Sequence, residues 1–185
     1  PTVHERRSLR AAWPAPGPVP TTSAVILDTF DGESPFAAEN DSHSSILSPW
    51  QVPREEGEKG RAARLAFELG TPGPGRSNVW CALVDRTARD LRTFEGLTLS
   101  LKADGIYRLW VQVRDENMAS RDEGQEWWFA SVKTSLQWRR VAIPFSRLRS
   151  LNPNTDGHLN LDKVKALVLV LDQAAVPPGT RGTIW

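Results

Sequence analysis

The sequence predicts an all-β protein, a β-sandwich of the jelly-roll type built from two antiparallel sheets with little helix. Three observations lead to this fold class. Short segments carry apolar residues at every second position, turn-forming residues separate these segments, and no stretch has the 3.6-residue period of a long helix. With 185 residues, 39% of them hydrophobic, the chain is long enough for one domain with its own core.

The expected strands follow from this alternation and from the turns between them. Residues 165–173, KALVLVLDQ, are apolar on both faces, which indicates a central strand. Pro49 confines the segment around it to a sheet edge or a bulge. Residues 85–96 and 146–164 are polar and predict loops with at most a short helical turn. The expected strands are residues 23–30, 45–52, 62–70, 78–84, 97–105, 106–115, 125–133, 138–145, 165–173 and 177–185.

The chain divides into a tail and one domain. Residues 1–23 contain WPAPGPVP, a proline-rich spacer that is typical of an extended, flexible linker. Residues 24–185 are expected to form the single jelly-roll domain. The sequence ends at GTIW, which reads as an interrupted strand, so we expect a truncated last strand and a chain that is part of a longer protein.

Composition argues against several classes of partner. The net charge of +1 gives no electrostatic reason to expect binding to nucleic acid or to an anionic membrane. No apolar run is long enough to cross a bilayer. Cys81 is the single cysteine, so an intrachain disulfide is impossible, and its place among alternating apolar residues predicts a small core side chain.

The sequence offers little for catalysis. The three histidines lie in the expected tail and loops without the spacing of metal ligands, and the chain has no nucleophile elbow, phosphate-binding loop or dinucleotide fingerprint. We therefore expect a binding module and no enzyme. A small hydrolase or lyase on the same fold remains an alternative, with Glu123 and Glu126 as its acid–base pair.

The segment Tyr107–Asp115, YRLWVQVRD, suggests where a ligand binds. Its apolar residues point to one face, while the other face places a tryptophan between an arginine and a glutamine. In the next strand we expect Trp127 and Phe129 to point inward, so that their neighbours point outward. The candidate ligand-binding residues on this polar face are Trp80, Arg108, Trp110, Gln112, Glu126, Trp128 and Arg140.

Flat indoles surrounded by hydrogen-bond donors and acceptors suit a polysaccharide. The C–H face of a pyranose packs on an indole, and the sugar hydroxyls need both kinds of partner around it. The structural interpretation stays open beside this one, because tryptophan is usually buried and an arginine next to a tryptophan is an ordinary stabilising pair.

Several stretches together resemble a known family. They are VILDTFDG, DLRTFEGLTLSLKADG, DEGQEWWF, WRRVAIPFSRL and GHLNLDKVKALVLVL, in this order from about Val25 to the end. They resemble the family 11 carbohydrate-binding modules and the related domain named for the 30 kDa complex I intermediate-associated protein (CIA30). The resemblance implies a non-catalytic jelly roll with a concave sheet that binds a β-glucan-like polysaccharide.

The same resemblance implies further expectations. Asp28 and Asp31 occupy the acidic positions of the opening motif and would contribute to a structural calcium site, and Glu123 stands where the family has an acidic ligand contact. Such a module would be extracellular or attached to the cell envelope, tethered through its linker to a catalytic domain or a surface protein. The family stacks sugars on tyrosines, and Tyr107 is the only tyrosine here. The alternative is therefore a CIA30-like protein-interaction domain, mitochondrial or cytoplasmic, that binds no sugar.

Overall fold

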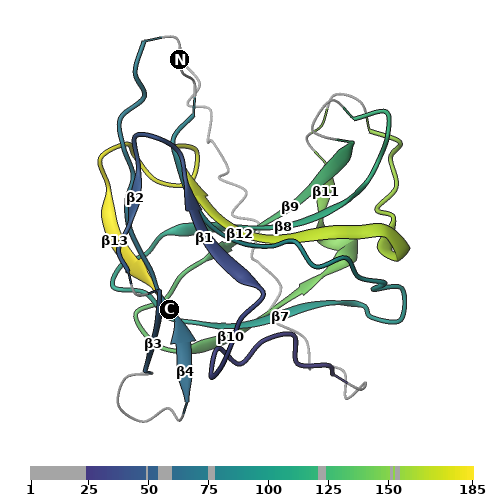
Figure 1. Cartoon of the computed structure of the whole chain (residues 1–185), viewed down its shortest axis with the longest axis horizontal. Helices are drawn as coiled ribbons and strands as arrows, with labels where there is room; N and C mark the ends of the chain where they lie inside the picture. Colours follow the sequence, from purple (N-terminus) through teal and green to yellow (C-terminus); the bar gives the residue numbers. More distant parts are fainter. Residues whose placement is uncertain are drawn as a thin grey trace, which may run out of the picture.

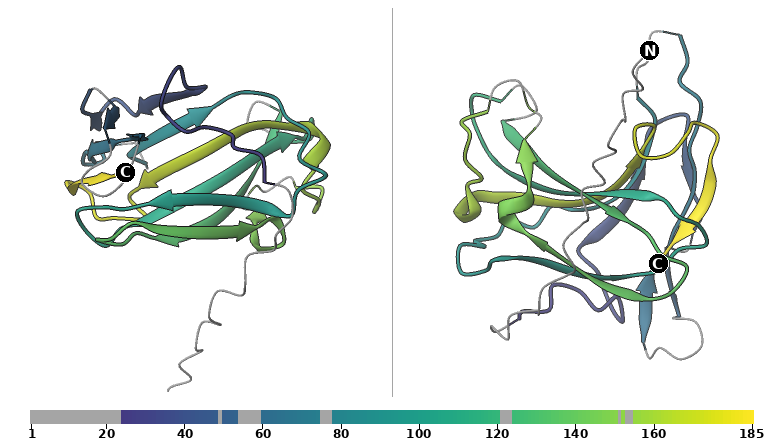
Figure 2. Two further views of the ribbon diagram at one scale, coloured as in Figure 1. Left: turned by 90° about the horizontal axis from the view of Figure 1, so that it is seen from below. Right: turned by 180° about the vertical axis from the view of Figure 1, so that it is seen from behind.

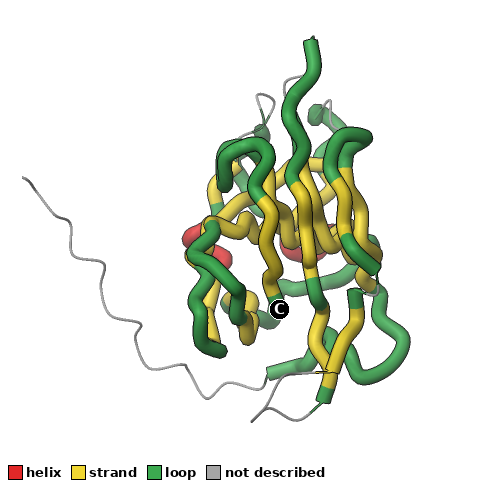
Figure 3. The backbone as a smooth tube through the Cα atoms, turned by 90° about the vertical axis from the view of Figure 1, so that its left-hand side faces the viewer, coloured by secondary structure: helices red, strands yellow, loops and turns green. Residues whose placement is uncertain are grey.

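A computed structural model describes residues 24–48, 50–53, 60–74, 78–120, 124–150, 152 and 155–185. The expected linker, residues 1–23, and the candidate Glu123 lie outside the described residues. Strands dominate the described part of the chain, and two short 3-10 helices, η1 (Phe145–Arg147) and η2 (Leu161–Lys163), complete it (Figure 3). This part contains no helix that is long and apolar enough to span a membrane.

One layer of the fold is a six-stranded antiparallel sheet. The expected central strand is confirmed, because β12 pairs with β6 on one side and with β8 on the other. In Figure 1 this sheet curves, with β1 on one side and β9 and β11 on the other, so that its face away from β7 and β10 is concave. Its strands, in spatial order, are β1 (Phe36–Asn40), β6 (Trp80–Asp85), β12 (Val164–Asp172), β8 (Arg108–Glu116), β9 (Gln125–Lys133) and β11 (Arg149–Ser150).

The second layer is assembled from shorter strand pairs. Lys102 and Trp185 exchange backbone hydrogen bonds of 2.9 and 2.8 Å, which join the end of β7 to the end of β13. The backbone N–H of Arg64 donates to the carbonyl of Trp50 at 2.5 Å and continues the β3–β4 ladder as far as the residue before β5. The pairings are β10 (Arg139–Pro144) with β7 (Gly96–Leu101), β13 (Arg181–Ile184) with β5 (Leu65–Glu68) and β2 (Ser45–Ile46), and β3 (Gln51–Pro53) with β4 (Arg61–Ala63).

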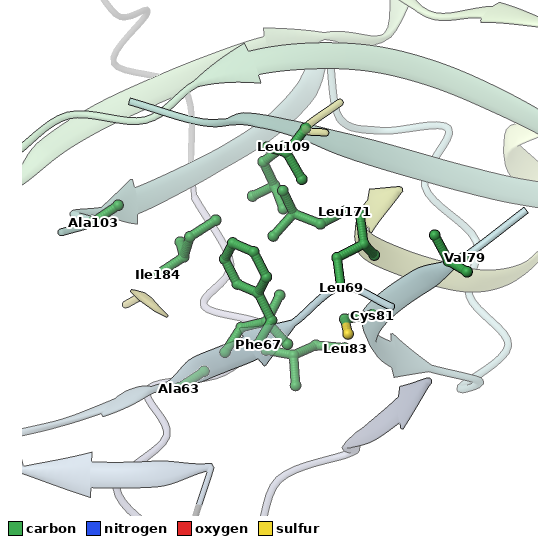
Figure 4. Close-up of a cluster of buried hydrophobic side chains, with 12 residues drawn as sticks. Ala63, Phe67, Leu69, Val79, Cys81, Leu83, Ala103, Leu109, Leu171 and Ile184 are labelled. Carbon is green, nitrogen blue, oxygen red and sulfur yellow. The ribbon is translucent and has the colours of Figure 1, made fainter. Parts of the chain in front are cut away.

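The two layers enclose an apolar core, as the predicted β-sandwich requires (Figure 2). Phe67 and Ile184 from the second layer pack in one cluster with Leu109 and Leu171 of the six-stranded sheet (Figure 4). Cys81 lies in the same cluster with no exposed surface, which confirms its predicted place in the core. Burial raises the pKa of its thiol to about 12.

The predicted first strand, residues 23–30, is wrong. Residues 24–30 form no strand, and Val25 and Ile26 are 63% and 74% exposed. The chain turns here because Asp28 accepts hydrogen bonds from the Phe30 backbone, at 2.6 Å, and from the Ser34 hydroxyl, while Phe30 takes a positive φ of 61°. Pairing with β6 begins only at Phe36, in a segment that sequence patterning missed.

Candidate functional site

The candidate site is the outer face of the six-stranded sheet, the face that points away from the second layer. Alternate residues of the strands point to it, except at Val164, which lies in the core where the register of β12 shifts. The register brings Ala82, Val170 and Trp110 side by side across three strands. The outer face includes Glu39, Trp80, Ala82, Val84, Arg108, Trp110, Gln112, Arg114, Glu116, Trp127, Phe129, Ser131, Lys133, Arg149, Ala166, Val168, Val170 and Asp172.

Small apolar side chains form the floor of this face. They are buried although they lie outside the core, and Trp80 and Trp110 pack against them. The two large indoles therefore help to cover the small side chains of this floor. The floor residues are Ala82, Val84, Ala166, Val168 and Val170.

Trp110 is held from several sides and remains partly exposed. Its Nε1 donates to Asp172 Oδ1 at 3.1 Å, and its ring meets the Phe129 ring edge-on with centroids 6.1 Å apart. The guanidinium carbon of Arg108 lies 4.8 Å from the centroid of the indole, and Arg108 also donates to the carbonyl of Ala174. The ring is therefore fixed in orientation, as a stacking platform requires.

A second arginine–tryptophan pair lies further along the outer face, with its arginine on β8 and its tryptophan on β9. The guanidinium carbon of Arg114 is 4.0 Å from the centroid of the Trp127 ring. Arg114 also donates through two of its nitrogens to Gln112 Oε1, at 3.1 and 3.0 Å. The structure thus places the predicted candidates Trp80, Arg108, Trp110 and Gln112 on one face, together with residues that were not predicted.

Strand β9 has the opposite orientation to the one predicted. Trp128 is directly across from Val113 and is only 9% exposed, with its Nε1 donating to Asp115 Oδ1 at 3.1 Å inside the core. Trp127 and Phe129 point to the outer face instead. The second half of the strand carried a signal for this orientation. Ser131 is polar and exposed and points to the same face as Trp127, which indicates that this face is the outer one.

Glu126 is also inside the sandwich and not on the outer face, contrary to prediction. It is completely buried and lies across from Asp115, which is buried as well. Asn117 Nδ2 donates to Glu126 Oε2 at 2.8 Å, and the Asn160 backbone donates to Asp115 Oδ2 at 2.6 Å. Burial raises the pKa of Asp115, and the negative charge of Glu126 adds to this rise.

Arg140 does not join the other candidates. Its strand, β10, pairs with β7 in the second layer, where Arg140 lies opposite Ser100 and is exposed. The prediction failed because alternation within WRRVAIPF gives the direction of a side chain but not the sheet to which the strand belongs.

The two proposed calcium ligands are engaged with the protein itself. Asp28 bonds within its own turn, and Asp31 Oδ1 accepts the backbone N–H of Arg61 at 2.7 Å. Among the described residues, no group of three or more His, Cys, Asp or Glu side chains is placed to hold a metal ion. Calcium takes about six to eight oxygen ligands, which these two carboxylates do not supply, so calcium binding here stays a prediction.

Comparison with solved structures identifies the fold. A family 11 carbohydrate-binding module from Clostridium thermocellum, in complex with a β-1,3-1,4-mixed-linked tetrasaccharide, matches with a TM-score of 0.66 and 18% identity over 88% of this chain and 92% of that chain. The family 11 module of a cellulosomal cellulase from the same organism matches with a TM-score of 0.65 and 18% identity over 88% and 91%.

A family 30 carbohydrate-binding module of another Clostridium thermocellum cellulosomal cellulase matches less closely, with a TM-score of 0.55 and 13% identity over 81% of this chain and 86% of that chain. No family model matches the sequence, and the search of curated proteins gave no match. The fold of this chain is therefore that of the family 11 carbohydrate-binding modules.

Proposed function

We propose that this chain is a non-catalytic carbohydrate-binding module that holds a polysaccharide on the outer face of its six-stranded sheet. The observation that carries the proposal is the set of partly exposed aromatic side chains on that face, Trp80, Trp110, Trp127 and Phe129. Soluble domains usually direct such side chains into the core. Their position over a curved sheet supports contact with an extended ligand.

The polar groups of this face suit a sugar. Arg108 and Arg114 supply donors, Asp172 and Glu39 supply acceptors, and all of them are fixed by neighbouring side chains or backbone. Each sugar hydroxyl loses water before it gains a partner, so we expect modest affinity for a single site.

The module's role follows from weak binding to a polymer. The proline-rich segment 1–23 would tether the domain to a catalytic domain or a surface protein outside the cell, and binding would raise the local concentration of substrate. The family 11 and family 30 neighbours from cellulosomal cellulases support this place in a larger extracellular protein.

Native affinity electrophoresis tests the proposal. The domain is run through gels that contain mixed-linkage β-glucan, xylan, xyloglucan, glucomannan, alginate or polygalacturonate, next to a Trp110→Ala/Trp127→Ala variant. We expect one polysaccharide to retard the wild type and the variant to lose that retardation while keeping its circular dichroism spectrum. A folded wild type that no gel retards would contradict the proposal and favour the protein-interaction alternative.

A further inference from the structure

The charges of the outer face point to a narrower class of ligand. Resting on the proposed function, we infer that the polysaccharide is anionic, with carboxylate or sulfate groups that bind the arginines of this face. The family 11 structure described above holds a β-1,3-1,4-mixed-linked tetrasaccharide, and the charges of this chain's own outer face, not the shared fold, indicate an anionic ligand.

The first observation is an imbalance of charge on one surface. Within the described residues, the acidic side chains of this face already have partners: Glu39 pairs with Arg86, Glu116 with Lys165 at 2.7 Å, and Asp172 accepts from Trp110 and from two backbone N–H groups. Arg108, Lys133 and Arg149, in contrast, form no ion pair with any described carboxylate. The whole chain carries a net charge of only +1, so the excess of positive charge is local.

The second observation is a pair of like charges on neighbouring strands. Arg108 of β8 lies directly across from Lys133 of β9, and both side chains point to the outer face. Like charges in directly opposite positions destabilise a sheet. A carboxylate or sulfate bound between the two side chains removes this repulsion and gains two charge-assisted hydrogen bonds.

The third observation is that guanidinium groups cover two of the indole rings on which a sugar would stack. Arg108 and Arg114 both lie against indoles, those of Trp110 and Trp127. A neutral sugar that stacks on the covered side of either ring must displace a guanidinium from a favourable contact. An acidic sugar binds the guanidinium where it stands, through its planar donor edge.

The fourth observation is that the unsatisfied polar atoms of this face are donors. Arg108 Nε and Trp127 Nε1 are buried without an acceptor among the described residues, whereas Trp110 Nε1 has one in Asp172. A ligand rich in acceptor oxygens therefore complements this face better than one rich in donors.

The experiment measures binding of the intact chain to alginate and polygalacturonate as uronate polymers, dextran sulfate as a sulfated polymer, and mixed-linkage β-glucan as a neutral polymer. Each titration is made at about 0.05 M and about 0.5 M NaCl. We expect an anionic polymer to bind most tightly and to lose about tenfold or more in affinity at the higher salt. Preference for uronate over sulfate, or the reverse, identifies the acidic group.

Two double variants separate a built site from general attraction of charge. Arg108→Ala/Lys133→Ala removes the like-charge pair, and Arg139→Ala/Arg140→Ala removes two exposed charges from β10 in the second layer. We expect the first to weaken binding about tenfold or more and the second about twofold at most. Equal losses in both variants, or binding to β-glucan alone, would overturn the inference but leave the proposed function standing. Binding to none of these polymers would overturn the inference, and failure to bind xylan, xyloglucan and glucomannan as well would overturn the proposed function.

Discussion

Asp115 and Glu126 face each other across β8 and β9, and both carboxyl groups are shut inside the sandwich. Asp115 accepts hydrogen bonds from Trp128 and Asn160, while Glu126 Oε1 has no partner among the described residues. Two buried carboxyl groups of like charge are costly, and the cost depends on whether they hold a proton. The protonation of Asp115 therefore makes the stability of this part of the core depend on pH.

The raised pKa of Asp115 predicts an unusual dependence of stability on pH. Because burial raises this pKa above its ordinary value of 3.8, the folded protein binds this proton at a higher pH than the unfolded chain does. The contribution of Asp115 to the free energy of unfolding therefore falls as pH rises from about 4 through the folded-state pKa. Carbon NMR of the Asp115 carboxyl group measures the titration directly. A midpoint at or below 3.8 would contradict the expected direction.

Removing the charge of Glu126 should stabilise the protein. Glu126→Gln keeps an oxygen to accept from Asn117 and takes away the negative charge that raises the pKa of Asp115. We expect a gain of about 1 kcal/mol at pH 7 in chemical denaturation, shrinking toward pH 4 as Asp115 becomes protonated in the wild type. Glu116→Gln, at the partly exposed end of the neighbouring strand β8, is the matched control and should give no gain. A Glu126→Gln variant less stable than wild type at pH 7 would count against this account of the pair.

The same substitution should cost more stability at Trp128 than at its neighbour Trp127. Trp128→Phe loses the hydrogen bond to Asp115 and leaves space in the core, so we expect a loss of about 1–3 kcal/mol in the free energy of unfolding. Trp127→Phe changes a partly exposed ring and should cost less than about 1 kcal/mol while weakening polysaccharide binding. The reverse order of stabilities, measured by urea denaturation, would mean that β9 has the orientation predicted from sequence.

The buried ion pair between Arg89 and Asp85 should be essential for stability. Burial alone would raise the pKa of Asp85, but hydrogen bonds from Arg89, at 2.5 Å, and from Thr87 hold that pKa below its ordinary value. Arg89→Ala leaves a buried carboxylate without its cation, and we expect a loss of about 3–5 kcal/mol. Arg92→Ala, which breaks an exposed pair with Asp90, should leave the unfolding midpoint unchanged. Similar midpoints for both variants would show that the Asp85 pair is not the stronger one.

The sequence was sufficient for those parts of the fold that depend on local pattern. The alternation of residues 107–115 placed Arg108, Trp110 and Gln112 on one face, because a strand of strict alternation has only two faces to choose from. In β9 one face carries Trp127 and Phe129 and the other carries Trp128, so the aromatic residues did not show which face is buried. The face of β9 that carries Glu126 is the buried one. Sequence patterning assigns a charged residue to the exposed face, so it predicted the wrong orientation.

The sequence also did not show which distant strands pair with one another. Arg140 was assigned to the polar face from its direction alone, but β10 belongs to the second layer. Residues 24–30 carry the apolar run of a strand and yet form a turn, because the Asp28 carboxylate satisfies nearby donors that a strand would pair with a neighbour.

The most direct test of the central claim uses the tryptophans themselves. The chain has eight, and each indole N–H gives its own signal in a nitrogen–proton NMR spectrum. The domain is titrated with oligosaccharides prepared from alginate, polygalacturonate and mixed-linkage β-glucan. We predict that one series shifts the indole signals of Trp80, Trp110 and Trp127 while the signal of buried Trp128 stays in place. Shifts confined to tryptophans away from the outer face, or no shifts with any series, would contradict a polysaccharide site on this sheet.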